Sequence, residues 1–334
     1  MCVVVLGGGP AGTAAALTLL QAQVPVTIVE RSPFPRYRPG ETLHPGIEPL
    51  LARLGVEEIL HAAGYIRHMG VWSAWAEPIR FVPYGGDGNG PWRGFQAIRS
   101  DFDRRLLEKA CENGASLVAG EVSGVLAGAD GSIRGVQTSA GPIFARYVID
   151  CTGSSHTLAR HLRIPVVRHS RQLIARFGYA TGQYGGPAPS IQSDANGWTW
   201  ITEVAPTRFQ WTRVTEAYHR PTPAWIPASL QGLDAEPSRG ADVSWRMAAD
   251  VAGPGYFLTG DAAAVLDPSS SHGVLRAVMS GMMAAHLAVQ DICFGADAKV
   301  CARYFQEWFT SWFREDSKKM SRMYQEANLF GFGN

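Results

Sequence analysis

The stretch MCVVVLGGGPAG at residues 1–12 decides the fold. Its first six residues are apolar and rich in valine, which predicts a buried parallel strand. Gly7, Gly9 and Gly12 then form the pattern G-x-G-x-x-G, and an Ala- and Leu-rich run at residues 13–21 predicts a helix. A strand, a glycine loop and a helix in this order begin a dinucleotide-binding βαβ unit.

A second apolar strand ends in Glu30, about 20 residues beyond the glycine loop, the offset at which an acidic side chain binds a ribose hydroxyl. The same carboxylate disfavours a 2′-phosphate, so the sequence predicts FAD or NAD and not NADP. The N-terminus of the first helix offers free N–H groups and a positive dipole end to the phosphates. Contacts to the cofactor are expected from the loop residues Gly7, Gly9, Pro10, Ala11 and Gly12.

The composition is that of an ordinary globular protein: 334 residues, 46% hydrophobic and 18% charged, with a net charge of +1. This mixed charge favours no polyanion-binding surface, so nucleic acid is not an expected partner. Five cysteines without a C-x-x-C pair indicate a reducing, cytoplasmic compartment and no zinc site. The first strand begins at once, which leaves no room for a signal peptide, and no apolar run reaches the ~18 residues that span a bilayer.

A basic, proline-rich connection at residues 31–41 follows the second strand. Its arginines, Arg31, Arg36 and Arg38, either contact the adenosine and phosphates of the cofactor or lie on a solvated face. Leucines and isoleucine near helical spacing then predict a short helix at residues 42–54.

The middle of the chain predicts two kinds of β structure. Residues 64–100 alternate around a glycine-rich hairpin, which predicts a β-ribbon inserted between parallel strands. A helix follows to about residue 113, with Ser100 or Asp101 as its N-cap. Residues 163–254 are rich in Trp, Tyr, Arg and Pro and predict a β-rich lobe, the natural place for a substrate.

The last part of the chain returns to the first lobe. A short apolar strand ends in Gly260-Asp261, and a polar turn at residues 267–274 leads into a helix of small residues at 275–292. A final helix at 302–324 carries a broad aromatic stripe that either packs on the body or forms a docking surface or substrate wall. We predict four segments: 1–162, first part of the nucleotide-binding domain; 163–254, β-rich substrate lobe; 255–295, return to the nucleotide-binding domain; 296–334, C-terminal helical tail.

Separated pieces of the chain form a recognisable set. They are the glycine loop with Glu30, the Arg38-x-Gly-Glu41 region, Ile149-Asp-Cys-Thr-Gly153, and Gly260-Asp261 followed by Ser271-His-Gly273. Together they resemble the FAD-dependent monooxygenase and halogenase superfamily, which has the fold of p-hydroxybenzoate hydroxylase. The resemblance implies an α/β fold with a Rossmann-type FAD-binding domain (a mixed parallel sheet with a β-ribbon insertion), a β-rich substrate lobe and C-terminal helices.

The resemblance also implies roles in binding FAD. Glu30 would bind the adenosine ribose, Arg99 would lie by the diphosphate, and Asp261 would bind the ribityl chain. The amides of Gly273 and Val274, at a helix N-terminus, would face the pyrimidine edge of the flavin, where the reduced ring carries negative charge. Further cofactor contacts are expected from Arg31, Arg38, Gly153 and Gly260.

Two features set the expected reaction within the superfamily. Gly197-Trp-Thr-Trp-Ile201 is similar to the Gly-Trp-x-Trp-x-Ile-Pro signature of flavin-dependent halogenases, with Thr202 in place of the proline. Halogenases also use a lysine to relay the oxidised halide, but Arg67-His68-Met69-Gly70 stands at that place and no lysine precedes Lys109. The missing lysine, and a chain shorter than is usual for halogenases, weaken halogenation as the activity.

Hydroxylation of an electron-rich, indole- or tryptophan-like ring through a flavin C4a-hydroperoxide is therefore the expected activity. The Asp-Cys-Thr-Gly turn makes a separate flavin reductase or electron donor plausible. The compact length and the turn before the late helix are similar to the flavoproteins that mature tryptophylquinone cofactors, which hydroxylate a tryptophan inside a partner protein. The alternatives are a halogenase and either a reductase of an isoprenoid-like (geranylgeranyl-type) alkene or a partner-binding flavoprotein without turnover.

His272 is the first candidate for proton handling, because it precedes Gly273 and should lie beside the isoalloxazine. The alternative is a turn histidine bonded to backbone. His44 and His68 are weaker candidates for the same task, and Glu41 either orients near the flavin or is a carboxylate at a helix N-terminus.

Trp198 and Trp200 are candidates for an aromatic substrate pocket. Alternate residues of a strand point the same way, so both indoles should share one face of the lobe. Structural packing is an equal alternative for them.

Overall fold

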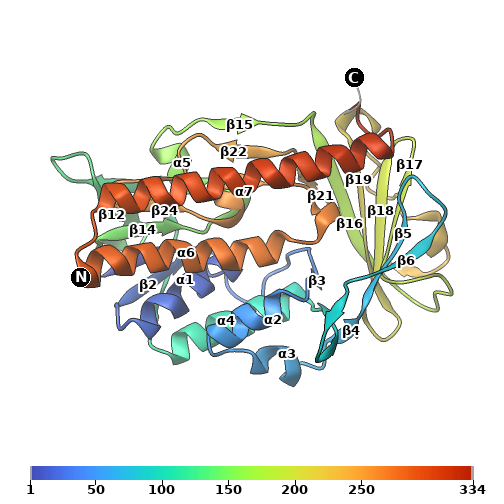
Figure 1. Ribbon diagram of the computed structural model, residues 1–334, viewed down its shortest axis with the longest axis horizontal. Coiled ribbons are helices and arrows are strands. Elements are labelled where there is room, and N and C mark those ends of the chain that lie inside the picture. Colours follow the sequence, from blue (N-terminus) through green and yellow to red (C-terminus); the bar gives the residue numbers. More distant parts are fainter. Residues whose placement is uncertain (1, 332–334) are drawn as a thin grey trace.

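The structure is a computed structural model that describes residues 2–331, and within them the first lobe is built on a six-stranded sheet (Figure 1). The strand order is β10-β2-β1-β14-β24-β23, with every neighbouring pair parallel except β23 and β24. β1 is wholly buried, as expected for a strand covered on both faces. The bounds are β1 Val3–Leu6, β2 Val26–Glu30, β10 Ser116–Ala119, β14 Tyr147–Asp150, β23 Ala252–Gly253 and β24 Tyr256–Leu258.

Long helices cover this sheet: α1 (Pro10–Gln21), α4 (Arg99–Glu112) and α6 (Gly273–Phe294). α6 packs closely on α1, because a Cβ added to Gly281 would stand 2.1 Å from the carbonyl oxygen of Ala11. Within the described chain, α6 is the one helix whose length and composition would allow it to cross a membrane. Its buried residues and its place beside α1 and α7 (Ala298–Glu326; Figure 1) are those of a core helix, so this is weak evidence for a span.

The second lobe, again within the described residues, is an eight-stranded sheet of order β20-β16-β19-β18-β17-β5-β6, in which β21 pairs with β16. Residues 70–83 form two of its strands, which pair antiparallel, so the predicted β-ribbon is present between β2 and β10 in chain order. It joins the second lobe because β5 pairs in parallel with β17, where Trp72 lies opposite Ser190. The bounds are β5 Gly70–Ala74, β6 Arg80–Pro83, β16 Leu173–Thr181, β17 Ser190–Asp194, β18 Gly197–Ala205, β19 Arg208–Glu216, β20 Asp234–Ala235 and β21 Arg239–Asp242.

Two helix predictions need correction. Residues 42–54 are not one helix: β3 (Thr42–Leu43) pairs with β9, and α2 (Ile47–Arg53) begins only after Gly46. α4 has Ile98 at its N-cap and no side-chain cap. Asp101 instead binds two arginines of its own helix, Arg104 and Arg105, each at 2.8 Å, since both lie within one turn of it.

The C-terminal helix α7 runs beside α6 and ends against the second sheet (Figure 1). Phe305, Phe309 and Phe313 are buried, which confirms that the aromatic stripe packs on the body. The remaining elements are α3 Glu58–Ala62, α5 Thr157–His161, β4 Ile66–His68, β7 Gly86–Asp87, β8 Gly90–Pro91, β9 Gly94–Gln96, β11 Val122–Ala127, β12 Ile133–Thr138, β13 Gly141–Phe144, β15 Val166–Arg168, β22 Arg246–Ala248 and β25 Ala264–Val265.

Candidate functional site

The glycine loop is a tight backbone cradle at the carboxyl end of β1. Gly7 has a φ of +99°, and a Cβ there would stand 2.6 Å from the carbonyl oxygen of Cys151. A Cβ on Gly12 would stand 1.9 Å from the carbonyl oxygen of Gly7. Gly9 is the N-cap of α1 and offers no side-chain cap, so the first amides of this helix remain available to a phosphate.

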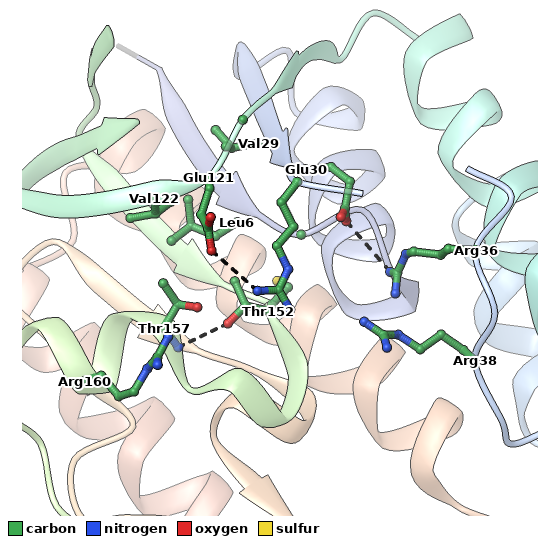
Figure 2. Close-up of a pocket in the computed structure, with 14 residues that line it drawn as sticks. Leu6, Val29, Glu30, Arg36, Arg38, Glu121, Val122, Thr152, Thr157 and Arg160 are labelled. Atoms are coloured by element: carbon green, nitrogen blue, oxygen red, sulfur yellow. Dashed lines mark hydrogen bonds and ion pairs between the residues drawn. The ribbon is translucent and has the colours of Figure 1, made fainter. Parts of the chain in front are cut away.

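Glu30 closes the cradle from the end of β2. Its carboxylate accepts hydrogen bonds from the amides of Gly8 at 2.8 Å and Ser32 at 2.9 Å. Arg36 lies beside it, with 3.8 Å between the guanidinium nitrogen and the Glu30 oxygen (Figure 2).

Arg36 provides a test of whether a dinucleotide fits. Its side chain is 15% exposed, and its Nε is buried without a hydrogen-bond partner among the described residues. Burial lowers the pKa of the guanidinium even though Glu30 and Asp103 raise it. The site thus holds a cation that its neighbours do not fully compensate, which fits a diphosphate.

A pocket opens between these elements (Figure 2). Arg31 and Arg38, both predicted to contact the cofactor, line it, and Arg160 faces them from α5. Arg31 also lies 3.6 Å from Glu121 and donates to the Ser155 hydroxyl at 3.3 Å. The pocket lies at the carboxyl ends of the parallel strands, where open α/β sheets bind their ligands.

Two turns at the ends of β14 and β24 extend the site away from the pocket. Gly153 has a φ of +69° and Gly260 a φ of +52°, and the amide of Gly260 donates to the Ser280 hydroxyl of α6. Buried His156 joins the two turns: its Nδ1 lies 2.9 Å from the Ala262 carbonyl oxygen, and Nε2 lies 3.1 Å from the Arg246 Nε. No motif in the sequence had singled out His156.

Arg99 and Asp261 are two further residues that the sequence predicts to contact FAD. Arg99 makes a bidentate ion pair with buried Asp103, at 2.8 and 2.9 Å, and donates to the Pro39 carbonyl at 3.1 Å. Asp261 is exposed in a second, smaller pocket that Arg276 also lines. The protein around Asp261 raises the pKa of its carboxyl, while Arg246 and Arg99 act in the opposite direction. The predicted contacts of Arg99 and Asp261 with FAD stay predictions.

The N-terminus of α6 lies next to this second pocket. Gly273 is exposed and Val274 is buried, and the N-cap residue His272 makes no side-chain cap. A Cβ on Gly273 would meet no atom within 4 Å, so there is open space beside the first turn of this 22-residue helix. These amides can therefore receive negative charge on a ligand.

Three of the four predicted catalytic residues lie in one line of rings. The centroids of His272 and His44 are 4.7 Å apart. Tyr84, which sequence reasoning missed, lies 5.4 Å from His44 on one side and 5.4 Å from His68 on the other. The line connects the N-terminus of α6 with β4, and we call these four residues the His–Tyr line.

The histidines of this line are held neutral. The Nδ1 of His68 lies 3.1 Å from the Gly70 carbonyl and so carries the proton, which leaves the buried Nε2 without a hydrogen-bond partner among the described residues. The Nδ1 of His44 accepts from the amide of Gly46 at 3.0 Å. Burial lowers the pKa of both rings, and burial together with Arg276, His44 and Lys319 lowers the pKa of His272 to about 3.

Glu41 lies apart from the His–Tyr line and is bonded elsewhere. It is 1% exposed, Tyr179 of β16 donates its hydroxyl to the carboxylate, and the amide of Gly40 donates at 2.8 Å. It is followed by β3, so the alternative of a carboxylate at a helix N-terminus is wrong. Burial raises the pKa of Glu41, and the Tyr179 hydrogen bond opposes the shift.

Trp198 and Trp200 pack in the same buried cluster, as expected for alternate residues of one strand. Trp198 is 1% exposed and donates its indole N–H to the Tyr324 hydroxyl at 2.8 Å. Packing therefore accounts for Trp198, and a role of either indole in a substrate pocket stays a prediction. Across residues 2–331, no group of three or more His, Cys, Asp or Glu side chains is placed to hold a metal ion, and all five cysteines are free.

Comparison with known proteins agrees with this geometry. Residues 1–209 match the family model described as "FAD binding domain". The chain belongs to this FAD-binding family. FAD is accordingly the expected cofactor, and the contacts of the cradle, Glu30 and Arg36 with it stay predictions. The resemblance to the FAD-dependent monooxygenase and halogenase superfamily is thereby confirmed, as is the predicted α/β class.

Three individual proteins show which kinds of enzyme this chain is similar to. This FAD-binding chain is 28% identical to the tryptophan 2-halogenase of Chondromyces crocatus over 93% of its own length, but it spans only 65% of that enzyme. The solved structure of the myxobacterial chondrochloren halogenase CndH matches 97% of this chain and 82% of that one, with a TM-score of 0.86 at 21% identity. The peptidyl tryptophan dihydroxylase QhpG matches 97% of this chain and 75% of that one, with a TM-score of 0.77 at 19% identity. The two structures show a shared fold.

Proposed function

We propose that this FAD-binding chain hydroxylates an electron-rich aromatic ring of the indole or tryptophan type. Bound FAD, once reduced, supplies the activation of dioxygen. The residues around it must then place the ring, exclude water and hold or move protons.

The observation that carries this proposal is the composition of the His–Tyr line. His68 belongs to the segment at residues 67–70 that stands where the halogenase pattern has a lysine, and burial lowers the pKa of its imidazole. A neutral imidazole accepts a proton from an aromatic N–H or O–H, but it has no amine to carry an oxidised halide. The site is thus better suited to deprotonating an electron-rich ring than to relaying a halide.

Each member of the line has a task under this proposal. His272, next to the free amides of α6, is neutral at neutral pH, since the pKa of its cation is about 3, and a ring nitrogen without a proton can accept a hydrogen bond from the substrate. His44 contacts that ring and limits its rotation. Tyr84 is half-buried and its ring lies between those of His44 and His68, so its hydroxyl can bind a polar group of the substrate.

The form of the substrate and the source of electrons belong to the same proposal. A free aromatic molecule and a tryptophan within a partner protein both suit it, and the structural similarity to the peptidyl tryptophan dihydroxylase QhpG supports the second. A separate flavin reductase or electron donor is proposed to reduce the cofactor. We place the reaction in the cytoplasm.

Halogenation is the second candidate. The relative from C. crocatus carries the name of a halogenase, and Gly197–Ile201 matches most of a halogenase signature. One lysine supports halogenation: the positive charge of Lys319, on α7, lowers the pKa of His272. Two further alternatives, reduction of an alkene and partner binding without turnover, rank lower. The second lobe is rich in aromatic residues and arginine, which suits a long apolar substrate less well than an aromatic one.

The experiment is a product analysis of the holoprotein with photochemically reduced FAD. Tryptophan, indole and a tryptophan-containing peptide are supplied with ¹⁸O₂ and bromide. Hydroxylation predicts a product that gains one or two labelled oxygen atoms. A brominated product, or reduction of an added polyprenyl alkene without oxygen, would replace the proposal by the corresponding alternative.

A further inference from the structure

A buried carboxylate, Asp267, joins the C-terminal helix to the loop that precedes α6. Asp267 is 1% exposed. Tyr324 of α7 donates its hydroxyl to one carboxylate oxygen at 2.7 Å, and the indole of Trp245 donates to the same oxygen at 2.6 Å. The other oxygen accepts from the amide of Ser269 at 3.0 Å, so three donors converge on this side chain.

Tyr324 is itself fixed from several sides. It is fully buried, and its oxygen accepts the indole N–H of Trp198 from β18 at 2.8 Å. Its ring contacts Trp75 and Trp245, with centroid distances of 5.4 and 5.7 Å. The indole of Trp75 in turn donates to the Met323 carbonyl at 2.7 Å. Such packing holds the phenol in one orientation, aimed at Asp267.

The loop between Asp267 and His272 has few attachments of its own. The Ser270 hydroxyl is buried without a hydrogen-bond partner among the described residues, and Ser271 has a left-handed φ of +52°. The short helix Pro268–Ser270 is capped by Asp267. The position of His272 therefore depends on where Asp267 is held.

We infer that Tyr324 is a positioning residue for the reaction site, which it serves by holding Asp267 and, through the 267–272 loop, His272 and the first amides of α6 in place. The inference rests on the proposed function for its consequence in catalysis. It also gives the aromatic C-terminal helix a task beyond packing: the helix connects the second sheet to the loop that faces the flavin. No covalent or redox step is involved.

Tyr324→Phe tests this link, since it removes the hydroxyl and keeps the ring. Tyr304→Phe, on the same helix but 56% exposed, is the matched control. The readouts are the protonation of His272, followed by NMR of ¹⁵N-histidine-labelled protein and assigned with His272→Gln, and the Kd for FAD from fluorescence titration. Neither readout needs a substrate.

A released loop exposes His272 to water, so its pKa should rise from about 3 toward its ordinary 6.5 in Tyr324→Phe. The proton affinity of His272 should increase at least tenfold in Tyr324→Phe, and the Kd for FAD should rise several-fold. Tyr304→Phe should give the wild-type value in both measurements. A lower melting temperature with unchanged His272 protonation would show a merely structural role and overturn the inference.

Asp267→Asn breaks the same link from its other end and serves if Tyr324→Phe does not fold. It should shift His272 in the same direction. Unchanged His272 protonation and FAD affinity in Asp267→Asn would contradict the inference just as well. If the readouts move but no hydroxylated product is ever found, the link stands and the proposed function fails.

Discussion

The imidazole rings of His44 and His272 lie 4.7 Å apart and are inclined by 60°. His44 directly follows β3 near the start of the chain, whereas His272 caps the late helix α6. Their contact joins an early segment of the chain to a late one. It also brings both rings out of water, which keeps them neutral.

Glu30→Gln should weaken FAD binding. The substitution keeps the size of the side chain but removes the charge that receives the amides of Gly8 and Ser32. A hydrogen bond to a charged group contributes about 1.5–3 kcal/mol, so the Kd for FAD should rise by about 10–100-fold. Glu121→Gln, on the opposite wall of the same pocket, is the control, and equal effects of the two variants in a fluorescence titration would contradict the role of Glu30.

Gly12→Ala should destabilise the protein severely. The new Cβ would meet the Gly7 carbonyl at 1.9 Å, and because that atom is backbone the loop or the helix must move. We expect a loss of more than about 3 kcal/mol in urea unfolding. Gly88→Ala meets no atom within 4 Å and should change the free energy of unfolding little. A Gly12→Ala protein as stable as the wild type would refute this close packing.

The protein should lose stability as the pH is lowered, and part of this loss should come from His272. Its pKa is about 3 in the folded protein against an ordinary 6.5, so below pH 6.5 the unfolded chain takes up a proton that the folded chain refuses. Between pH 7.5 and pH 5 this group should cost about 1–2 kcal/mol. In urea unfolding, His272→Gln should lose that much less stability over this range, whereas His286→Gln, exposed on the same helix, should behave as the wild type. An identical pH dependence in all three proteins would count against a buried, neutral His272.

Glu41→Gln should stabilise the protein at neutral pH. Burial raises the pKa of Glu41 above its ordinary 4.5, so the folded state favours the protonated acid and loses stability as pH rises through that raised pKa. A neutral glutamine should therefore raise the free energy of unfolding at pH 7.5 and have a smaller effect at pH 4. Glu307→Gln, exposed on α7, is the control for urea unfolding at both pH values. Destabilisation of Glu41→Gln at pH 7.5 would show that the carboxylate is fully compensated.

The part of the site that depends on local sequence could be predicted, and the part that depends on long-range contacts could not. The glycine loop and Glu30 were placed correctly because their spacing alone requires the βαβ turn. His44, His68 and His272 could be named as candidates, but their common line depends on how distant segments pack.

Tyr84 and Tyr179 were missed for the same reason. Each is a single tyrosine outside any motif, and each acquires its meaning only from a partner across the fold, His44 or Glu41. Likewise β5 and β6 could not be assigned to the second sheet from the sequence, because the pairing of β5 with β17 joins segments more than a hundred residues apart, as at Trp72 and Ser190, and β6 follows by pairing with β5. Alternation identifies a strand but not its neighbour.

The most direct test of the central claim, that one FAD extends from the glycine loop to His272, is a titration of the purified apoprotein with FAD, followed by absorbance near 450 nm and by thermal unfolding. The account predicts a yellow one-to-one complex with a raised melting temperature, from which ADP displaces FAD by occupying the pocket beside Glu30. In His272→Gln the flavin band should shift while ADP still binds, because the two ends of the cofactor lie at different parts of the site. A colourless protein that FAD neither colours nor stabilises would contradict the claim.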